Sequence, residues 1–203
     1  MKHFSFSKFL KEWLGFILIM TLILLSRLFF WGTVKVDGHS MDPTLADKEM
    51  LLVLQHLPID RYDIVVAKET DADGKTKEII KRVIGMPGDT ITFKNDQLYI
   101  NNEMVDEPYL ADYKAKFEKD KLQSTYSYNA YFQQLAQQAE AFTIDAEGKA
   151  SFTLTVPEGE YLLLGDDRLV SKDSRAVGTF KKEQIISEAK FRFWPFTRIG
   201  GLK

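Results

Sequence analysis

The 203-residue sequence contains no cysteine, which excludes disulfide bonds, thiolate catalysis and zinc sites with cysteine ligands. The absence also suits an oxidising environment outside the cytoplasm, where a free thiol is a liability. Positive charge is not in excess, because the formal net charge is −2. The charge balance therefore does not indicate a basic surface that would bind nucleic acid. The length allows one good-sized core with room for an inserted subdomain.

Histidine, the commonest general base in enzymes, occurs only three times. His3 lies before the hydrophobic segment described next. His39 directly precedes Ser40, a serine that could act as a nucleophile. In an extended chain two neighbouring side chains point to opposite sides, which places His39 badly as a base for that serine. His56 follows a predicted strand and stays open as a base. A Ser-His-Asp triad is therefore poorly supported.

The longest hydrophobic run extends from Trp13 to Trp31. A bilayer-spanning helix needs about 20 mainly apolar residues, and tryptophans at both ends together with lysines before the run favour a cytoplasmic N-terminus. We predict a cytoplasmic segment at residues 1–12 and one transmembrane anchor at 13–31, with Arg27 reaching the interface. A cleaved signal peptide would be followed by small residues, and a buried core helix is rarely so long.

After this run, apolar residues recur with period two, which is typical of strands. Asn95-Asp96 and Asn101-Asn102 are turn signals that indicate a meander. Because strands follow one another without helices between them, we predict a mainly β fold with an antiparallel core at residues 32–105 and 155–203. The expected strands are Met50–Gln55, Ile64–Ala67, Glu78–Ile84, Thr90–Phe93, Gln97–Ile100, Phe152–Val156, Tyr161–Leu164 and Lys190–Trp194.

The segment between the two parts of this core differs in composition. From about Tyr109 to Phe142 it is rich in Lys, Gln, Ala and Tyr and lacks Gly and Pro. We interpret residues 106–154 as an inserted, partly helical subdomain. An apolar stripe with helical spacing is expected to pack on the sheet, although a partner surface stays open. The stripe consists of Tyr128, Phe132, Leu135 and Ala139.

Two short motifs carry groups that can act together in catalysis. Ser40 stands in GHSMDPTL, residues 38–45, and Lys81 stands in IIKRVIGMPGD, residues 79–89. A hydroxyl needs a base before it can attack a carbonyl, and a neutral lysine can be that base. On the predicted strand Lys81 shares a face with two apolar neighbours, so desolvation lowers its pKa from about 10.4 by several units. If the two residues meet, this is a serine protease without a catalytic histidine.

A third motif, GDDRLVSKDSR at residues 165–175, is dense in hydrogen-bonding groups. Ser171 can orient a neutral lysine, and an Asp173–Arg175 ion pair can brace the loop. A plain polar surface loop is the alternative. Its two adjacent aspartates suggest a metal pair, but no histidine or calcium-loop pattern stands nearby, so we predict no metal and no cofactor.

These three motifs resemble those of the bacterial type I signal peptidases. Their order and the hydrophobic run before them agree, and the likeness covers about residues 13–105 and 155–198. A single anchor and a short chain resemble the Gram-positive form of the family. The resemblance implies a β-rich enzyme at the outer face of the cytoplasmic membrane that removes signal peptides from exported preproteins. It further implies contact with membrane lipid, and we expect a monomer.

The resemblance also implies roles for individual residues. Ser40 is the expected nucleophile and Lys81 the expected general base, with a hydrogen bond from Ser171 to that lysine. Asp173 and Arg175 are expected to support the site. The pocket for the residue before the cut is expected near Met41 and Ile80.

Two departures from the family pattern affect these expectations. Many relatives have a serine two places before the nucleophile, whose hydroxyl helps the oxyanion hole, where this sequence has Gly38. The hole must then use the Ser40 backbone N–H and a second donor, such as the Gly38 backbone or water. Leu169 and Val170 stand where Asp-Asn is frequent, so we expect that part of the loop to pack rather than hydrogen-bond.

Two other functions stay open from the sequence. One is a dedicated Ser-Lys protease that matures a pilus or transfer protein. The other is a non-catalytic, membrane-tethered β module that binds exported chains.

Overall fold

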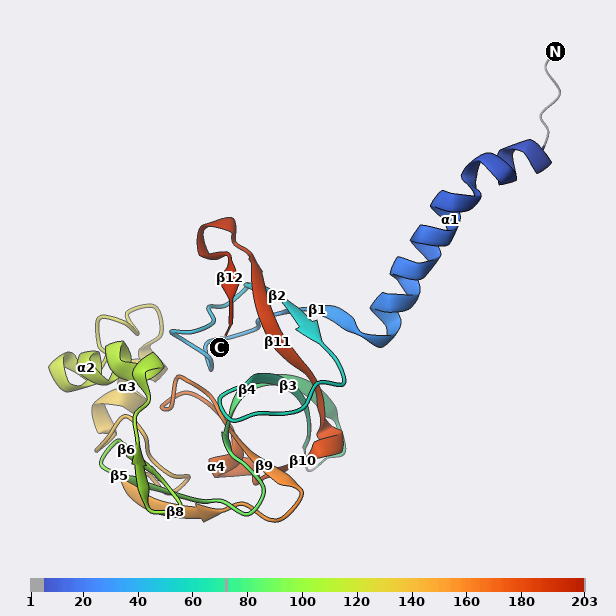
Figure 1. Cartoon of the computed structure of the whole chain (residues 1–203). Helices are drawn as coiled ribbons and strands as arrows, with labels where there is room; N and C mark the ends of the chain where they lie inside the picture. The colour runs from blue at the N-terminus through green and yellow to red at the C-terminus, as the bar shows by residue number, and fades with distance from the viewer. Residues whose placement is uncertain (1–5, 72, 203) are drawn as a thin grey trace.

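The computed structural model describes residues 6–71 and 73–202, and its β-strands form two antiparallel sheets (Figure 1). The larger sheet has the order β1-β2-β11-β3-β4-β9-β10, with β12 paired to β11. Its strands are β1 (Trp31–Lys35), β2 (Met50–Leu54), β3 (Ile64–Thr70), β4 (Thr76–Gly85), β9 (Glu160–Leu164), β10 (Phe180–Lys181), β11 (Ile185–Trp194) and β12 (Gly200–Gly201).

The smaller sheet has the order β7-β6-β5-β8. Its strands are β5 (Thr90–Lys94), β6 (Gln97–Ile100), β7 (Glu103–Val105) and β8 (Ser151–Thr155). The helices are α1 (Phe6–Phe29), α2 (Ala111–Asp120), α3 (Ala130–Gln138) and α4 (Ser174–Val177), with short 3₁₀ turns η1 (Pro108–Leu110), η2 (Lys182–Gln184) and η3 (Phe196–Arg198).

The prediction of a mainly antiparallel β fold is confirmed, and each expected strand overlaps an observed one. The predicted meander is also present. Asn95 and Asp96 have positive φ in the β5–β6 turn, and Asn101 and Asn102 have it in the β6–β7 turn. Tight hairpin turns need this conformation, and asparagine and aspartate tolerate it well. The short strands β10 and β12 were not predicted, because two residues leave no period-two pattern.

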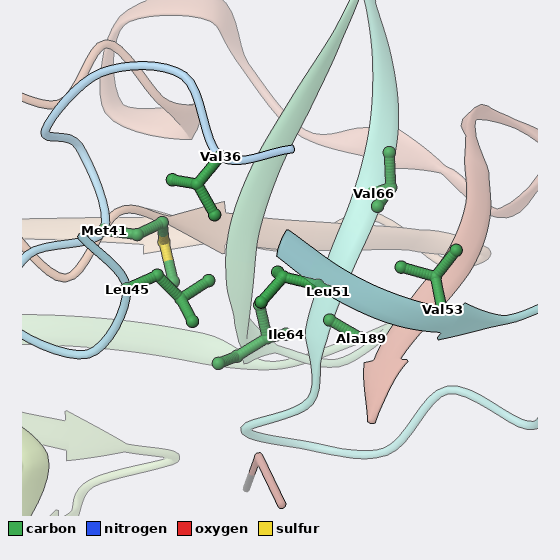
Figure 2. Close-up of a cluster of buried hydrophobic side chains, with 8 residues drawn as sticks. All are labelled: Val36, Met41, Leu45, Leu51, Val53, Ile64, Val66 and Ala189. Atoms are coloured by element: carbon green, nitrogen blue, oxygen red, sulfur yellow. The ribbon is translucent and has the colours of Figure 1, made fainter. Parts of the chain in front are cut away.

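Alternating side chains of the large sheet supply two different apolar clusters. On one face of β3, Ile64 and Val66 join the cluster drawn in Figure 2, which also contains two residues of the Ser40 motif, Met41 and Leu45. On the other face, Val65 joins a cluster with a valine of β4 and with residues of β9 and β10. The Ser40 motif is therefore fixed to the sheet by its own hydrophobic residues.

The inserted segment has an apolar cluster of its own, built mainly from α2, α3 and the residues between them. The expected stripe does not simply pack on the sheet. Ala139 is buried in the insert's cluster and Phe132 packs against it, whereas Tyr128 is 54% exposed. The difference arises because α2 and α3 bury their apolar residues together in the insert's own cluster. As expected, Leu169 and Val170 pack, and they do so against this cluster.

The anchor predicted at residues 13–31 is not supported in that form. Within residues 6–71 and 73–202, no helix is both long enough and apolar enough to cross a membrane. The predicted end was also wrong, since α1 ends at Phe29 and Trp31 begins β1, where it pairs with Leu54 of β2. Helix α1 projects away from the β domain, on the side opposite α2 and α3 (Figure 1).

Candidate active site

Ser40 lies in the connection between β1 and β2, which is held in place by its flanking residues. Met41 is 1% exposed and Leu45 is fully buried, so the apolar core fixes the chain directly after Ser40 (Figure 2). Before it, Gly38 has φ of 87° and its N–H donates to Asp47 Oδ1 at 2.8 Å. Glycine adopts that φ without the strain that a side chain would bring. Ser40 itself stays half-buried.

Lys81 approaches Ser40 from the middle of β4, and its Nζ lies 2.7 Å from Ser40 Oγ. Only 4% of Lys81 is exposed. As the alternation predicted, the residues two places before and after it belong to one apolar cluster. Burial lowers the pKa of Lys81 to about 8, although the negative charges of Asp173 and Glu69 act in the opposite direction. A much larger neutral fraction is thus available near neutral pH than for a free lysine.

The loop after β9 closes over this pair through Gly165. A Cβ at Gly165 would lie 2.2 Å from Ser171 Oγ and 2.4 Å from the Ser40 carbonyl oxygen. No side chain larger than hydrogen fits that gap without moving the backbone. In the same loop, the Asp167 N–H donates a hydrogen bond to the Ser40 carbonyl oxygen at 3.1 Å. The loop and the Ser40 turn are thus in direct backbone contact.

Asp173 and Arg175 form an ion pair at 2.8 Å, with both side chains buried. Asp173 also accepts from the Gly165 N–H at 2.9 Å and from the Arg175 N–H at the start of α4. Burial acts to raise the pKa of Asp173, but the charge of Arg175 lowers it below its ordinary value. Arg175 in turn donates to the Ile144 carbonyl of the insert at 2.8 Å.

The expected hydrogen bond between Ser171 and Lys81 is not present. Ser171 Oγ is buried and has no partner at normal hydrogen-bond geometry in the described part of the chain. It does lie close enough to the Asp173 carboxyl to lower its pKa. The orienting role of Ser171 stays a prediction.

The Ser40 backbone N–H, an expected donor of the oxyanion hole, is available. The Ser40 N–H donates no hydrogen bond to any described residue. The suggestion that the Gly38 N–H is the second donor is wrong, because Asp47 already accepts from it.

Met41 and Ile80 both contact the cluster under the Ser40 turn, which agrees with a location beside the pair without testing their role. His56 is exposed and lines a cavity whose lining contains neither Ser40 nor Lys81. It therefore does not belong to this site.

Two buried ion pairs were not predicted from the sequence. Arg82 Nη2 lies 2.6 Å from Asp166 Oδ2, and Arg168 pairs with Glu107 at the root of the insert. Arg82 also lies over the ring of Tyr109, with its Cζ 4.1 Å from the ring centroid. The only sequence signal was the presence of arginines in strongly apolar or loop segments. Among the described residues, no three His, Asp or Glu side chains gather as a metal site.

Comparisons with known proteins agree with the resemblance seen in the motifs. The chain matches the family described as "Signal peptidase, peptidase S26" over residues 10–194. It is 63% identical over 202 residues to a signal peptidase I of Streptococcus pneumoniae, covering 96% of this chain and 98% of the relative. It is 38% identical over 204 residues to signal peptidase I S of Bacillus subtilis, covering 98% and 96%.

A crystal structure of a signal peptidase I from Enterococcus faecalis is also similar. The sequence identity is 29% and the TM-score 0.45, with 65% of this chain and 97% of the other covered.

Proposed function

Since the chain belongs to the signal peptidase family, peptidase S26, we propose that it is a serine endopeptidase that removes signal peptides from exported preproteins. Ser40 is the nucleophile and Lys81 the general base. The observation that carries this assignment is the 2.7 Å contact between Lys81 Nζ and Ser40 Oγ in a buried setting. Asp173 and Arg175 hold the loop that covers the pair.

The reaction begins with neutral Lys81, which accepts the proton of Ser40 while Oγ attacks the carbonyl carbon before the cut. The Ser40 N–H is available to stabilise the oxyanion that forms. Lys81 then gives its proton to the departing amine, and the C–N bond breaks to leave an acyl-enzyme. In the second half, Lys81 takes a proton from water while the water oxygen attacks the acyl carbon. The bond between that carbon and Oγ then breaks, and Lys81 returns the proton to Oγ, which restores Ser40 and the neutral lysine.

The substrate adds to a free edge of β4. This strand pairs with β3 from Thr76 to Arg82, whereas β9 covers its other edge only from Arg82 to Gly85. The edge before Arg82 thus has no strand partner among the described residues, and it leads directly to Lys81. An extended peptide can hydrogen-bond there as an added strand, which brings it beside Ile80 and Met41. These side chains shape a shallow pocket for a small residue such as alanine.

Helix α1 attaches the enzyme to lipid. Its apolar side chains are exposed along most of its length, including Leu18, Leu22 and Leu28. Apolar surface of this extent is stabilised by transfer out of water. Aspartate at Leu18 and Leu22 should release the protein from the membrane fraction. The same change at the exposed Met104 of β7 is the control, and equal release by both variants would contradict the role of α1.

The orientation expected from the sequence has the N-terminus in the cytoplasm and the catalytic domain outside. Protease added to intact cells tests it, because only external domains are digested.

The function is tested with the full-length protein and a preprotein that has Ala-x-Ala before its cleavage site. Mass spectrometry should find the signal peptide released at that site by the wild type and not by Ser40→Ala. Ser151→Ala, which changes an exposed serine in β8, should cleave normally. A fluorophosphonate probe should label Ser40 alone. Cleavage by Ser40→Ala at the wild-type rate would overturn the assignment.

A further inference from the structure

The insert reaches the catalytic loop through one buried tyrosine. Tyr126 lies between α2 and α3 in the insert's apolar cluster and is fully buried. Its hydroxyl donates to Asp167 Oδ1 at 2.6 Å. The other oxygen of that carboxylate, Oδ2, has no partner at normal hydrogen-bond geometry among the described residues. Tyr126 therefore provides the one side-chain hydrogen bond that this buried aspartate receives there.

Asp167 connects the tyrosine to the nucleophile. Its backbone N–H donates to the Ser40 carbonyl oxygen at 3.1 Å, and Gly165, two residues earlier, is in close contact with the same oxygen. Asp167 thus links two hydrogen bonds, one that its side chain accepts from Tyr126 and one that its backbone donates to Ser40. A shift of the Asp167 side chain thus moves the group that contacts the backbone of Ser40.

A second contact joins the insert to the residue before Ser40. The ring of Tyr128 lies 4.7 Å from that of His39, and the ring of Phe132 lies 6.2 Å from it. His39 Nδ1 is 2.9 Å from Asp42 Oδ2, within the same turn. The insert therefore touches the Ser40 turn directly through ring packing, and it reaches the same turn indirectly through the hydrogen bond from Tyr126 to Asp167.

We propose that the insert is a positioning element of the active site and that Tyr126, acting through Asp167, is its positioning residue for Ser40. The proposal rests on the proposed Ser40–Lys81 mechanism and adds the insert to it. Neither residue touches the reacting atoms. Their effect is to keep Ser40 Oγ at hydrogen-bond distance from Lys81, which matters because displacement of about 1 Å can reduce a rate about 100-fold.

Tyr126→Phe is the direct test, because it removes the hydroxyl and keeps the ring. Tyr113→Phe is the matched control. Tyr113 is another buried tyrosine of the same cluster, and its hydroxyl makes no hydrogen bond to a described residue. We expect kcat for preprotein cleavage to fall about 10- to 100-fold in Tyr126→Phe, with little change in KM. Labelling of Ser40 by the fluorophosphonate probe should slow in parallel. Tyr113→Phe should keep the wild-type kcat.

Asp167→Asn provides a second variant and a double-mutant cycle. If Tyr126 acts through Asp167, the double variant should lose little more activity than the worse single variant, since residues in one network are not additive. The single Asp167→Asn variant decides the question alone if Tyr126→Phe does not fold. Unchanged kcat in a folded Tyr126→Phe or Asp167→Asn enzyme would overturn the proposal. Equal losses in Tyr126→Phe and Tyr113→Phe would also do so, because they would indicate general destabilisation of the insert. If the wild type itself releases no signal peptide, the proposed function fails instead.

Discussion

The β core and the insert meet at the candidate active site but contribute to it in different ways. In the core, Ser40 and Lys81 come from two backbone segments that are fixed by buried apolar residues and by sheet pairing. The insert builds a separate aromatic cluster and reaches the site through Tyr126 and Tyr128. In the proposed mechanism, the core thus carries the groups that react, and the insert carries groups that act only through neighbours. Changes in the core should affect chemistry, whereas most changes in the insert should affect little.

The largest effect is expected from Lys81→Arg. A base must lose its proton, and arginine does not do so in proteins. We expect a loss of about 100- to 10,000-fold in kcat, the usual contribution of general base catalysis, and a similar loss in Lys81→Met. Preprotein cleavage, with circular dichroism as the folding control, measures it. Substantial activity in a folded Lys81→Arg enzyme would mean that Lys81 acts as a charge and that another base must be sought.

Gly165→Ala should have the next largest effect, because the added methyl group would meet the Ser40 carbonyl oxygen and Ser171 Oγ at impossible distances. We expect kcat to fall about 100-fold as the loop moves, with a stability loss of about 1–3 kcal/mol. Gly200→Ala is the control, since a Cβ there has no atom within 4 Å. Kinetics and thermal unfolding of both variants test this. Equal behaviour of the two would show that the loop is not tightly held against Ser40.

The dependence of activity on pH should report the pKa of Lys81. Because the neutral lysine is the active form in the proposed mechanism and its pKa is lowered to about 8, activity should rise about tenfold per pH unit below 8 and level off above it. Glu69→Gln sharpens the test, since the charge of Glu69 raises this pKa. Its removal should move the profile to lower pH. A profile that moves to higher pH, or a wild-type limb that extends to the value of a free lysine, would argue against buried Lys81 as the base.

A smaller effect should appear at the contact between the two regions. Burial raises the pKa of Asp167 to about 7, although the hydrogen bond from Tyr126 lowers it. The folded state therefore holds a proton that the unfolded state releases above its ordinary pKa of 3.8. The stability that the protonated Asp167 carboxyl contributes is fully present below pH 3.8. It is lost as pH rises to about 7, because in that range the unfolded chain releases a proton that the folded protein keeps.

Asp167→Asn removes this titration. Urea unfolding between pH 4 and pH 8 should show wild-type stability falling relative to the variant. Parallel curves for the two proteins would indicate that Asp167 has an ordinary pKa in the folded state.

The smallest effect is expected at the exposed surface of the insert. Gln137 lies on α3 and is exposed, so Gln137→Ala should change stability by less than about 0.5 kcal/mol and leave kcat unaltered. If this change reduces cleavage as far as Tyr126→Phe does, the surface of the insert is itself part of the site.

The features that could be predicted from the sequence follow the same division between core and insert. The strands of the core were predicted because a half-buried strand alternates apolar and polar residues locally. The hairpin turns were predicted because asparagine and aspartate tolerate positive φ. The stripe in the insert was misplaced, since a helical repeat shows that one face is buried but not which element covers it. Trp31 was assigned to the anchor because hydrophobicity alone does not separate the end of α1 from the start of β1.

The β class, the meander and the motifs that contain Ser40, Lys81 and the loop after β9 could be predicted because each depends on residues that are neighbours in the sequence. Which charged and polar groups pair depends instead on how the chain folds in three dimensions. Arg82 and Asp166 lie 84 positions apart, and Tyr126 and Asp167 lie 41 apart. No local pattern encodes such pairs, because a buried ion or hydroxyl is satisfied by whatever the fold brings to it. The contact between the insert and the Ser40 turn is of this kind and became visible only in three dimensions.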